Sequence, residues 1–289
     1  MPKRDGQRGA ALLIVLWMLL LLSLLAAAFL STTRSDVAIA RNDVESARAR
    51  ELADAGVARA VLAVGQSDPK LRWRADGTPY TWPFGGGTVS LTIVAESGKI
   101  DLNAAPEAVL QTLFRASGAD DATSAQLAGE AMARRAANPP LQVVAVNGAI
   151  DPGMPPFADV EDLGALPGIP PQVLHAAMPL VTVYSGAATI DPATAPRGVL
   201  LALPGASPGD IDQFIAARAA QAEGKGIGGA PPPALAPFLA PATSQAFTVT
   251  SDARTDTGAR FVRRALVFLR DAQGRPYVVK RWAQGFDPN

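Results

Sequence analysis

The longest hydrophobic stretch of the chain lies close to its N-terminus. Ala10 to Leu30 contains no charged residue. At 1.5 Å of rise per residue, a helix over this stretch reaches roughly 30 Å, the thickness of the hydrocarbon core of a bilayer. Lys3, Arg4 and Arg8 precede it, against one acid, Asp5. Because basic flanking residues stay in the cytoplasm, the pattern predicts a cytoplasmic N-terminus and an exported body.

The helical pattern continues beyond this hydrophobic stretch. From Ser31 to Val64 there is no proline, and the first glycine is Gly56. Small and apolar residues recur at helical spacing, while charged residues fill the other faces. The sequence therefore predicts one continuous helix from Ala10 to about Val64, apolar in its first half and amphipathic in its second.

Two simpler interpretations compete for the first thirty residues. Ala26-Ala27-Ala28 has the small residues of a signal peptidase site, so an ordinary signal peptide would leave a secreted protein that begins at Phe29. A plain signal anchor is the second alternative. A secretory signal has no reason to continue into a helical rod, so the unbroken helical pattern favours a stem that stays attached.

Alternation with a period of two predicts strands in four later segments. In the first, Val89, Leu91 and Ile93 lie on one face. The four segments are Thr88–Glu96, Phe247–Ser251, Arg260–Arg270 and Tyr277–Trp282, with a turn at Gln273-Gly274 before the last. Four strands with one long interruption predict a single antiparallel sheet that packs on the second half of the helix and carries an insertion.

The interruption, about Ile100 to Ala240, is predicted to be helical and contains an internal repeat. Ile100–Leu113 matches Ile190–Leu203, and each copy follows a Ser-Gly pair. Each copy has an Asp that can cap, a Pro in the first helical turn and an apolar Val-Leu-x-x-Leu face. The duplication predicts two equivalent helical units. Gly224 to Pro241 predicts a linker that returns to the sheet.

Composition narrows the chemistry. The chain is 48% hydrophobic and 18% charged, has zero formal net charge, and contains one His and no Cys. Thiol chemistry, disulfides and multi-histidine metal sites are therefore excluded, and nothing favours nucleic acid. His175 lies on an apolar helical stretch and is expected to be a helix residue rather than a general base. Gly85-Gly86-Gly87 lacks the Lys-Ser/Thr of a nucleotide loop. The sequence predicts no enzyme.

The N-terminal motif resembles the leader of type IV prepilins. Gln7-Arg8-Gly9 directly precedes Ala10 and the hydrophobic run. The resemblance implies cleavage between Gly9 and Ala10 by a prepilin peptidase and methylation of the new N-terminus. Ile14 occupies the fifth mature position, where most pilins carry a Glu that neutralises a neighbour's N-terminal amine. A subunit with nothing above it has no such amine to meet.

The leader, Ile14, the apolar helix and the insertion together resemble the K-type minor pseudopilin of the type II (general) secretion pathway. The resemblance implies an α+β fold in which a pilin-like N-terminal helix packs on a small antiparallel sheet, with a large all-α insertion of helix-hairpin-helix or SAM-like pieces. The corresponding segments are a leader (1–9), a transmembrane and amphipathic helix (10–65), a sheet (66–99 and 242–289) and an inserted domain (100–241).

The resemblance also implies a location and partners. It implies a single-pass protein of the bacterial inner membrane, with a periplasmic body, that caps or nucleates the pseudopilus tip. The implied partners are other minor pseudopilins, the prepilin peptidase, the inner-membrane assembly platform and membrane lipid, with no nucleic acid.

Calcium is the cofactor that the resemblance implies, because pseudopilins of this pathway commonly bind it. Hard oxygen ligands are available at Asp252 and Asp256 and near Asp159, Glu161 and Asp162, but neither place follows the EF-hand pattern. Solvated loop acids are the favoured alternative at both.

A membrane-anchored helix-hairpin-helix receptor for DNA uptake is the competing function. The hairpins at Pro167-Gly168 and Pro204-Gly205 have no adjacent Lys or Arg, and their prolines remove amides that a phosphate would use. The sequence therefore favours a structural role for these hairpins.

Overall fold

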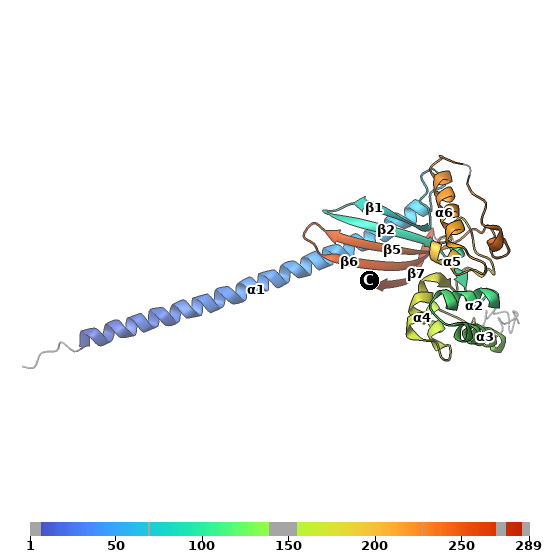
Figure 1. Ribbon diagram of the computed structural model, residues 1–289. Coiled ribbons are helices and arrows are strands. Elements are labelled where there is room, and N and C mark those ends of the chain that lie inside the picture. The colour runs from blue at the N-terminus through green and yellow to red at the C-terminus, as the bar shows by residue number, and fades with distance from the viewer. Residues whose placement is uncertain (1–6, 69, 139–154, 227, 270–275, 285–289) are drawn as a thin grey trace, which may run out of the picture.

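One long helix projects from the rest of the molecule. The computed structural model describes residues 7–68, 70–138, 155–226, 228–269 and 276–284, with the backbone alone described for 7–11 and 28–36. Helix α1 (Gln7–Val64) runs for 58 residues without interruption, roughly 85 Å at the standard rise. Its first half stands clear of the body and its second half packs on a sheet (Figure 1). The prediction of one continuous helix through Ser31 is confirmed.

The sheet has five antiparallel strands in the order β1-β2-β5-β6-β7. The strands are β1 (Asp76–Pro83), β2 (Gly87–Ala95), β5 (Ala246–Thr255), β6 (Arg260–Leu269) and β7 (Tyr277–Gln284). The four predicted strands are present; the predicted turn at Gln273-Gly274 lies outside the described residues. The prediction of four strands was wrong in missing β1. Pro79 and Pro83 obscure its pattern, and both are tolerated because β1 is an edge strand.

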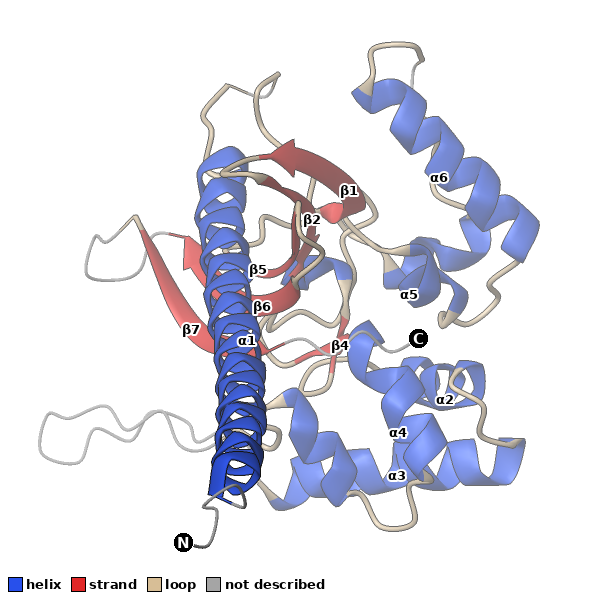
Figure 2. Cartoon of the chain, turned by 90° about the vertical axis from the view of Figure 1, so that its left-hand side faces the viewer, coloured by secondary structure: helices blue, strands red, loops and turns tan. Residues whose placement is uncertain are grey.

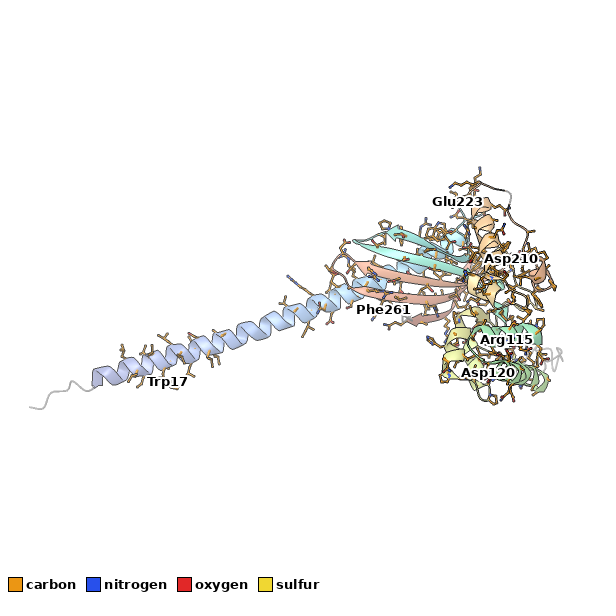
Figure 3. All side chains as sticks on the ribbon, viewed as in Figure 1. Trp17, Arg115, Asp120, Asp210, Glu223 and Phe261 are labelled. Atoms are coloured by element: carbon orange, nitrogen blue, oxygen red, sulfur yellow. The ribbon has the colours of Figure 1, made fainter. Side chains whose placement is uncertain are left out.

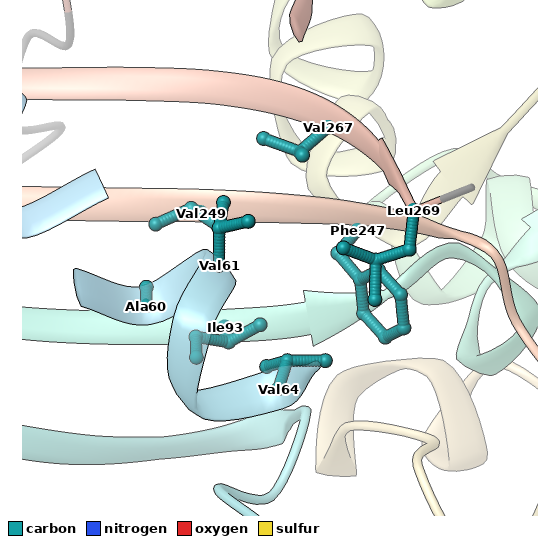
Figure 4. A pocket seen from close by; sticks show the side chains of 8 residues that line it. All are labelled: Ala60, Val61, Val64, Ile93, Phe247, Val249, Val267 and Leu269. Atoms are coloured by element: carbon teal, nitrogen blue, oxygen red, sulfur yellow. The ribbon is translucent and has the colours of Figure 1, made fainter. Parts of the chain in front are cut away.

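Small side chains allow α1 to lie close to the sheet. The helix packs across β2, β5 and β6, with β1 on one side and β7 on the other (Figure 2). A Cβ on Gly56 would lie 2.3 Å from Ser251 Oγ, so only glycine fits at this crossing. Ala53 and Ala60 are fully buried on the same helix face. Near the end of α1, valines of the helix interdigitate with apolar residues of β2, β5 and β6 (Figure 4).

The helical insert interrupts a pair of neighbouring strands. The chain leaves the sheet at the end of β2 and returns at the start of β5, where Ala95 is opposite Phe247. The insert comprises η1 (Glu96–Gly98), β3 (Ile100–Asp101), α2 (Glu107–Ala116), α3 (Asp121–Ala137), η2 (Val160–Ala165), α4 (Pro171–Ala177), η3 (Met178–Leu180), β4 (Val181–Thr182), α5 (Arg197–Leu201), α6 (Pro208–Ala222) and η4 (Pro233–Phe238). The predicted α+β class is confirmed. The two-residue parallel pair β3-β4 was not predicted.

The insert has a hydrophobic core of its own. That core contains Phe114, Phe157, Leu200 and Ile211, all fully buried, and it is separate from the clusters beneath α1. The helices form two groups, α2–α4 and α5–α6 (Figure 2). The body therefore has two hydrophobic clusters between helix and sheet and a separate core within the insert, so contacts at the junction must hold the insert to the sheet.

Candidate assembly surface

The predicted processing site lies at the start of α1. Gly9 and Ala10 fall within the first turns of the helix, and the residues before Gln7 lie outside the described part of the chain. Cleavage there stays a prediction, as does the role assigned to Ile14. The Ile14 side chain is 63% exposed, and the large apolar side chains from Leu12 to Leu25 are likewise uncovered by protein. Trp17 projects from this stretch far from the body (Figure 3).

Within the described residues, no helix is both long and apolar enough to cross a membrane.

Four of the five acidic residues considered for calcium pair with an arginine. Both carboxylate oxygens of Asp252 accept from Arg260, at 2.9 and 2.8 Å. Asp256 donates its backbone N–H to the Gly86 carbonyl. Glu161 binds Arg281 at the second place considered. No cluster of three or more potential metal-ligating side chains occurs in the described ranges. Calcium at Asp252 and Asp256 stays a prediction.

The two Leu-Pro-Gly turns have the same geometry. Gly168 and Gly205 have φ values of +78° and +77°. In each turn the residue after the glycine donates its N–H to the leucine carbonyl, at 3.4 and 3.2 Å, as in a type II turn. The neighbours nearest to a Cβ at these glycines are Gln126 and Ala234 rather than Lys or Arg. Because one backbone N–H in each turn already donates to the leucine carbonyl, that N–H is not free to bind a phosphate. The geometry of the turns therefore favours a role in packing.

The repeat in the sequence corresponds to a repeated turn. Asp101 and Asp191 each accept, through Oδ1, the N–H of the residue two positions on, at 2.8 and 3.1 Å. Their backbone carbonyls accept from Ala105 and Ala195, at 2.9 and 3.0 Å. The following prolines are the N-cap residues of α2 and α5, not residues of the first turn. The expectation that Asp or the next polar residue caps the helix was therefore wrong: each Asp closes a turn just before it.

An arginine on the next helix secures each of these turns. Arg135 of α3 donates to the carbonyls of Leu102 and Ala105, at 2.7 and 2.6 Å. Arg218 of α6 donates to the carbonyls of Pro192 and Ala195, both at 2.9 Å. Burial lowers the pKa of both guanidinium groups. Sequence matching missed this pair because the arginines lie outside the matched segments and at different distances from them.

Polar contacts join the insert to the sheet. Arg281 of β7 contacts Asp159 and Glu161 at the start of η2, at 2.8 Å for each carboxylate. Hydrogen bonds from Arg281 lower the pKa of Glu161 to about 2, whereas desolvation raises that of Asp159. Tyr184 meets Phe268 edge-on, with ring centroids 5.9 Å apart. These contacts fix the insert against the far end of the sheet.

Further polar contacts join the insert to β5 and β1. Glu96 accepts from Lys99 and from Thr248 of β5, at 2.6 Å each. Arg218 also reaches Asp76 of β1, at 3.6 Å. The residue that secures the second repeat thus also contacts the sheet.

Side chains of α1 tie the stem to the near end of the sheet. Arg48 donates to the Gly85 carbonyl at 2.8 Å. Thr257, in the turn between β5 and β6, donates to Glu45. Asp54 pairs with Arg263 of β6 at 2.5 Å. Stem and body are therefore joined along the side of the helix as well as through the apolar layer beneath it.

The similarity of this chain to known proteins is in structure. No family model and no curated protein matches the chain. Among solved structures, the chain is similar to one in the crystal structure of the GspK-GspI-GspJ complex from the type 2 secretion system of enterotoxigenic Escherichia coli. That match has 16% sequence identity and a TM-score of 0.48, and it covers 89% of this chain and 100% of the other.

Proposed function

We propose that this chain is a minor pseudopilin of the type II secretion system, and that it caps or nucleates the pseudopilus tip with other minor pseudopilins. The observation that carries the proposal is α1, which passes without a break from an exposed apolar segment into a segment packed on an antiparallel sheet. Such a helix can insert its free half among lipids or sister helices while its other half carries a body.

The apolar half of α1 supplies the anchor. The leucines from Leu12 to Leu25 have no protein cover, and exposing so many contiguous apolar side chains to water is unfavourable. Lipid around residues 10–30 removes that cost, and Lys3, Arg4 and Arg8 keep the N-terminus in the cytoplasm. The body then lies in the periplasm.

The insert supports a position at the tip. It extends from the end of the sheet farthest from the N-terminus of α1 and spreads sideways beyond the helix (Figure 1). A subunit stacked directly above would meet this bulk. Ile14 fits the same position, because a cap has no subunit above it whose amine needs a carboxylate. Such a chain acts by binding other subunits in a fixed geometry, and it catalyses no reaction.

Processing of the leader tests whether the chain is a pilin-like protein. N-terminal sequencing of membrane-extracted protein should give methylated Ala10, and Gly9→Val should leave the leader attached. Gly6→Val, at the other glycine of the same leader, is the matched control and should be processed normally. A start at Phe29 would indicate an ordinary secreted protein, and normal processing of the Gly9 variant would contradict the proposal.

Association with other pilin-like subunits tests the proposed role at the pseudopilus tip. The full chain, extracted in mild detergent from a bacterium that produces the whole secretion system, should co-purify with other pilin-like subunits. The Gly9→Val variant should lose them, because an unprocessed leader blocks assembly. Purification of the wild-type chain without such subunits would count against a tip complex.

A further inference from the structure

One side of α1 carries exposed and half-buried residues beside strand β1. Residues 44, 48, 55, 59 and 62 are separated by three, four or seven positions, which places them on one stripe of the helix. Two arginines of the stripe contact the segments on either side of β1: Arg48 binds the Gly85 carbonyl just after the strand, and Arg59 lies over Trp73 just before it. We call this surface the β1 flank and define it by Arg48, Arg59, Leu62, Trp73, Trp82 and Phe84.

The β1 flank carries aromatic rings held in fixed pairs. Trp73 stacks on Tyr80 with ring centroids 4.2 Å apart, and Trp82 stacks on Phe84 at 4.3 Å. The Tyr80 hydroxyl accepts the N–H of Arg74 at 2.7 Å. Phe84 remains 47% exposed and Leu62 63% exposed. Rigid aromatic side chains next to Arg are typical of the energetic centres of protein interfaces.

The arginine side chains on this flank contact aromatic rings and backbone carbonyls more than they contact carboxylates. The Arg59 guanidinium lies 4.9 Å from the Trp73 ring, and no carboxylate partner occurs for it among the described residues. The carboxylate nearest to Arg48 is that of Glu45, at 3.8 Å. Arg72 donates to the carbonyls of Gln66 and Ser67. Two acids, Glu45 beside Arg48 and Glu51 on the same side of the helix, offset part of this charge. Arg59 keeps its charge without a carboxylate partner among the described residues.

The opposite flank of α1 shows the contrasting arrangement. There Arg263 lies over the rings of Phe261 and Trp282, at 4.9 and 5.3 Å, and its charge is met by Asp54 of α1 itself. Arg263 thus has an acid from α1 itself, whereas Arg59 has no carboxylate partner among the described residues. Arg50, which lies over Phe261 at 5.3 Å on the β7 side, likewise has no carboxylate partner there. On the β1 flank, Arg59 is therefore available to an acidic group of another molecule, next to the exposed apolar side chains of Leu62 and Phe84.

We propose that the β1 flank is the docking surface for an acidic amphipathic helix of a second, different pilin-like subunit, which lies alongside α1. Ala55 is in the middle of the stripe, and its small side chain allows a second helix to approach closely. Leu62 and Phe84 contact the apolar face of that helix, and its Asp or Glu residues meet Arg48 and Arg59. The identity of the partner rests on the proposed function; the location and chemistry of the surface rest on the contacts above.

Photocrosslinking in the full chain tests this inference. p-Benzoylphenylalanine at position 84, in a bacterium that produces the whole secretion system, should crosslink to a different pilin-like subunit, and peptide mapping should place the adduct in its N-terminal helix. The same probe at Thr250, on the sheet face away from α1, should give no such adduct. Arg59→Glu should lower the crosslink yield about tenfold, as expected for loss of one charged contact.

Matched variants separate docking from folding. Arg254→Glu makes the same charge change on the outer face of the sheet and should leave the yield unchanged. Leu62→Glu alters an exposed side chain, so it spares the core and should still reduce the yield. An adduct with lipid, with a second copy of this chain or with a non-helical segment would overturn the inference, as would an unchanged yield in both flank variants. If pilin-like subunits still co-purify in that case, the proposed function stands and the flank alone is wrong.

Discussion

Arg218 holds the same place in the second half of the insert that Arg135 holds in the first. Each bonds two carbonyls, and those of Leu102 and Ala105 correspond in the repeat to those of Pro192 and Ala195. The duplicated unit is therefore a turn, a short helix and a longer helix whose arginine returns to the turn. The guanidinium satisfies carbonyls that the turn leaves without backbone partners.

Replacing either arginine should loosen its own turn. Arg135→Met and Arg218→Met keep the aliphatic stem but remove the charged hydrogen bonds, so each should lower the free energy of unfolding by roughly 2–3 kcal/mol. Hydrogen exchange of the full chain in detergent should show faster exchange of the Ala105 amide in the first variant and of the Ala195 amide in the second.

A surface arginine provides the control for that experiment. Arg115 pairs with Asp121 on the surface of the insert, and Arg115→Met should change stability by less than about 0.5 kcal/mol. Equal loss of protection at both turns in either variant would mean that the arginines support the insert as a whole rather than one repeat each.

Gly56 should be intolerant of any side chain. A Cβ there would lie 2.3 Å from Ser251 Oγ, 2.8 Å from Val89 Cγ1 and 2.9 Å from Leu91 Cδ2. Gly56→Ala therefore forces α1 away from the sheet and should cost about 1–3 kcal/mol, measured by thermal unfolding of the full chain in detergent.

Gly129→Ala is the matched control for Gly56→Ala, because Gly129 also lies inside a helix but a Cβ there would meet nothing within 4 Å. It should stabilise the chain by about 0.5–1 kcal/mol through helix propensity. A Gly56→Ala variant as stable as this control would show that α1 and the sheet can separate without cost.

The parts of the fold that sequence could predict are those whose signals are local and periodic. The helix through Ser31 follows from a long run without proline, and β2 follows from the alternation of Val89 with Leu91. Strand β1 was missed because an edge position relaxes the rules that a central strand must obey. Its Pro79 would argue against any strand with two neighbours.

The candidate surface was less predictable, because it depends on contacts between distant segments. Arg59 and Trp73 are close in sequence, but their roles depend on where β1 lies relative to α1, which no local pattern specifies. The contrast between Arg59 and Arg263 likewise requires the placement of Asp54 opposite β6. The leader at Gly9, by comparison, is a linear motif and can be read directly.

Acid should weaken the contact between β7 and the insert. Hydrogen bonds from Arg281 lower the pKa of Glu161 to about 2, whereas the pKa of a glutamate in the unfolded chain is about 4.3. A carboxyl group with a depressed folded pKa stabilises the fold above its unfolded value, and this stabilisation is lost as pH falls through the folded value. The contribution of Glu161 should therefore be complete above about pH 4.3 and disappear towards pH 2.

Melting temperatures of the wild-type chain and of Glu161→Gln, measured in detergent from pH 6 to pH 2, test this expectation. The wild type should melt higher at pH 6, and the difference should shrink to zero as Glu161 is protonated. Asp159 has a raised pKa because of desolvation and its neighbour Glu161, so it takes up its proton first and cannot account for a loss that continues towards pH 2. A constant difference between wild type and Glu161→Gln across this range would mean that the pair with Arg281 does not hold the insert in place.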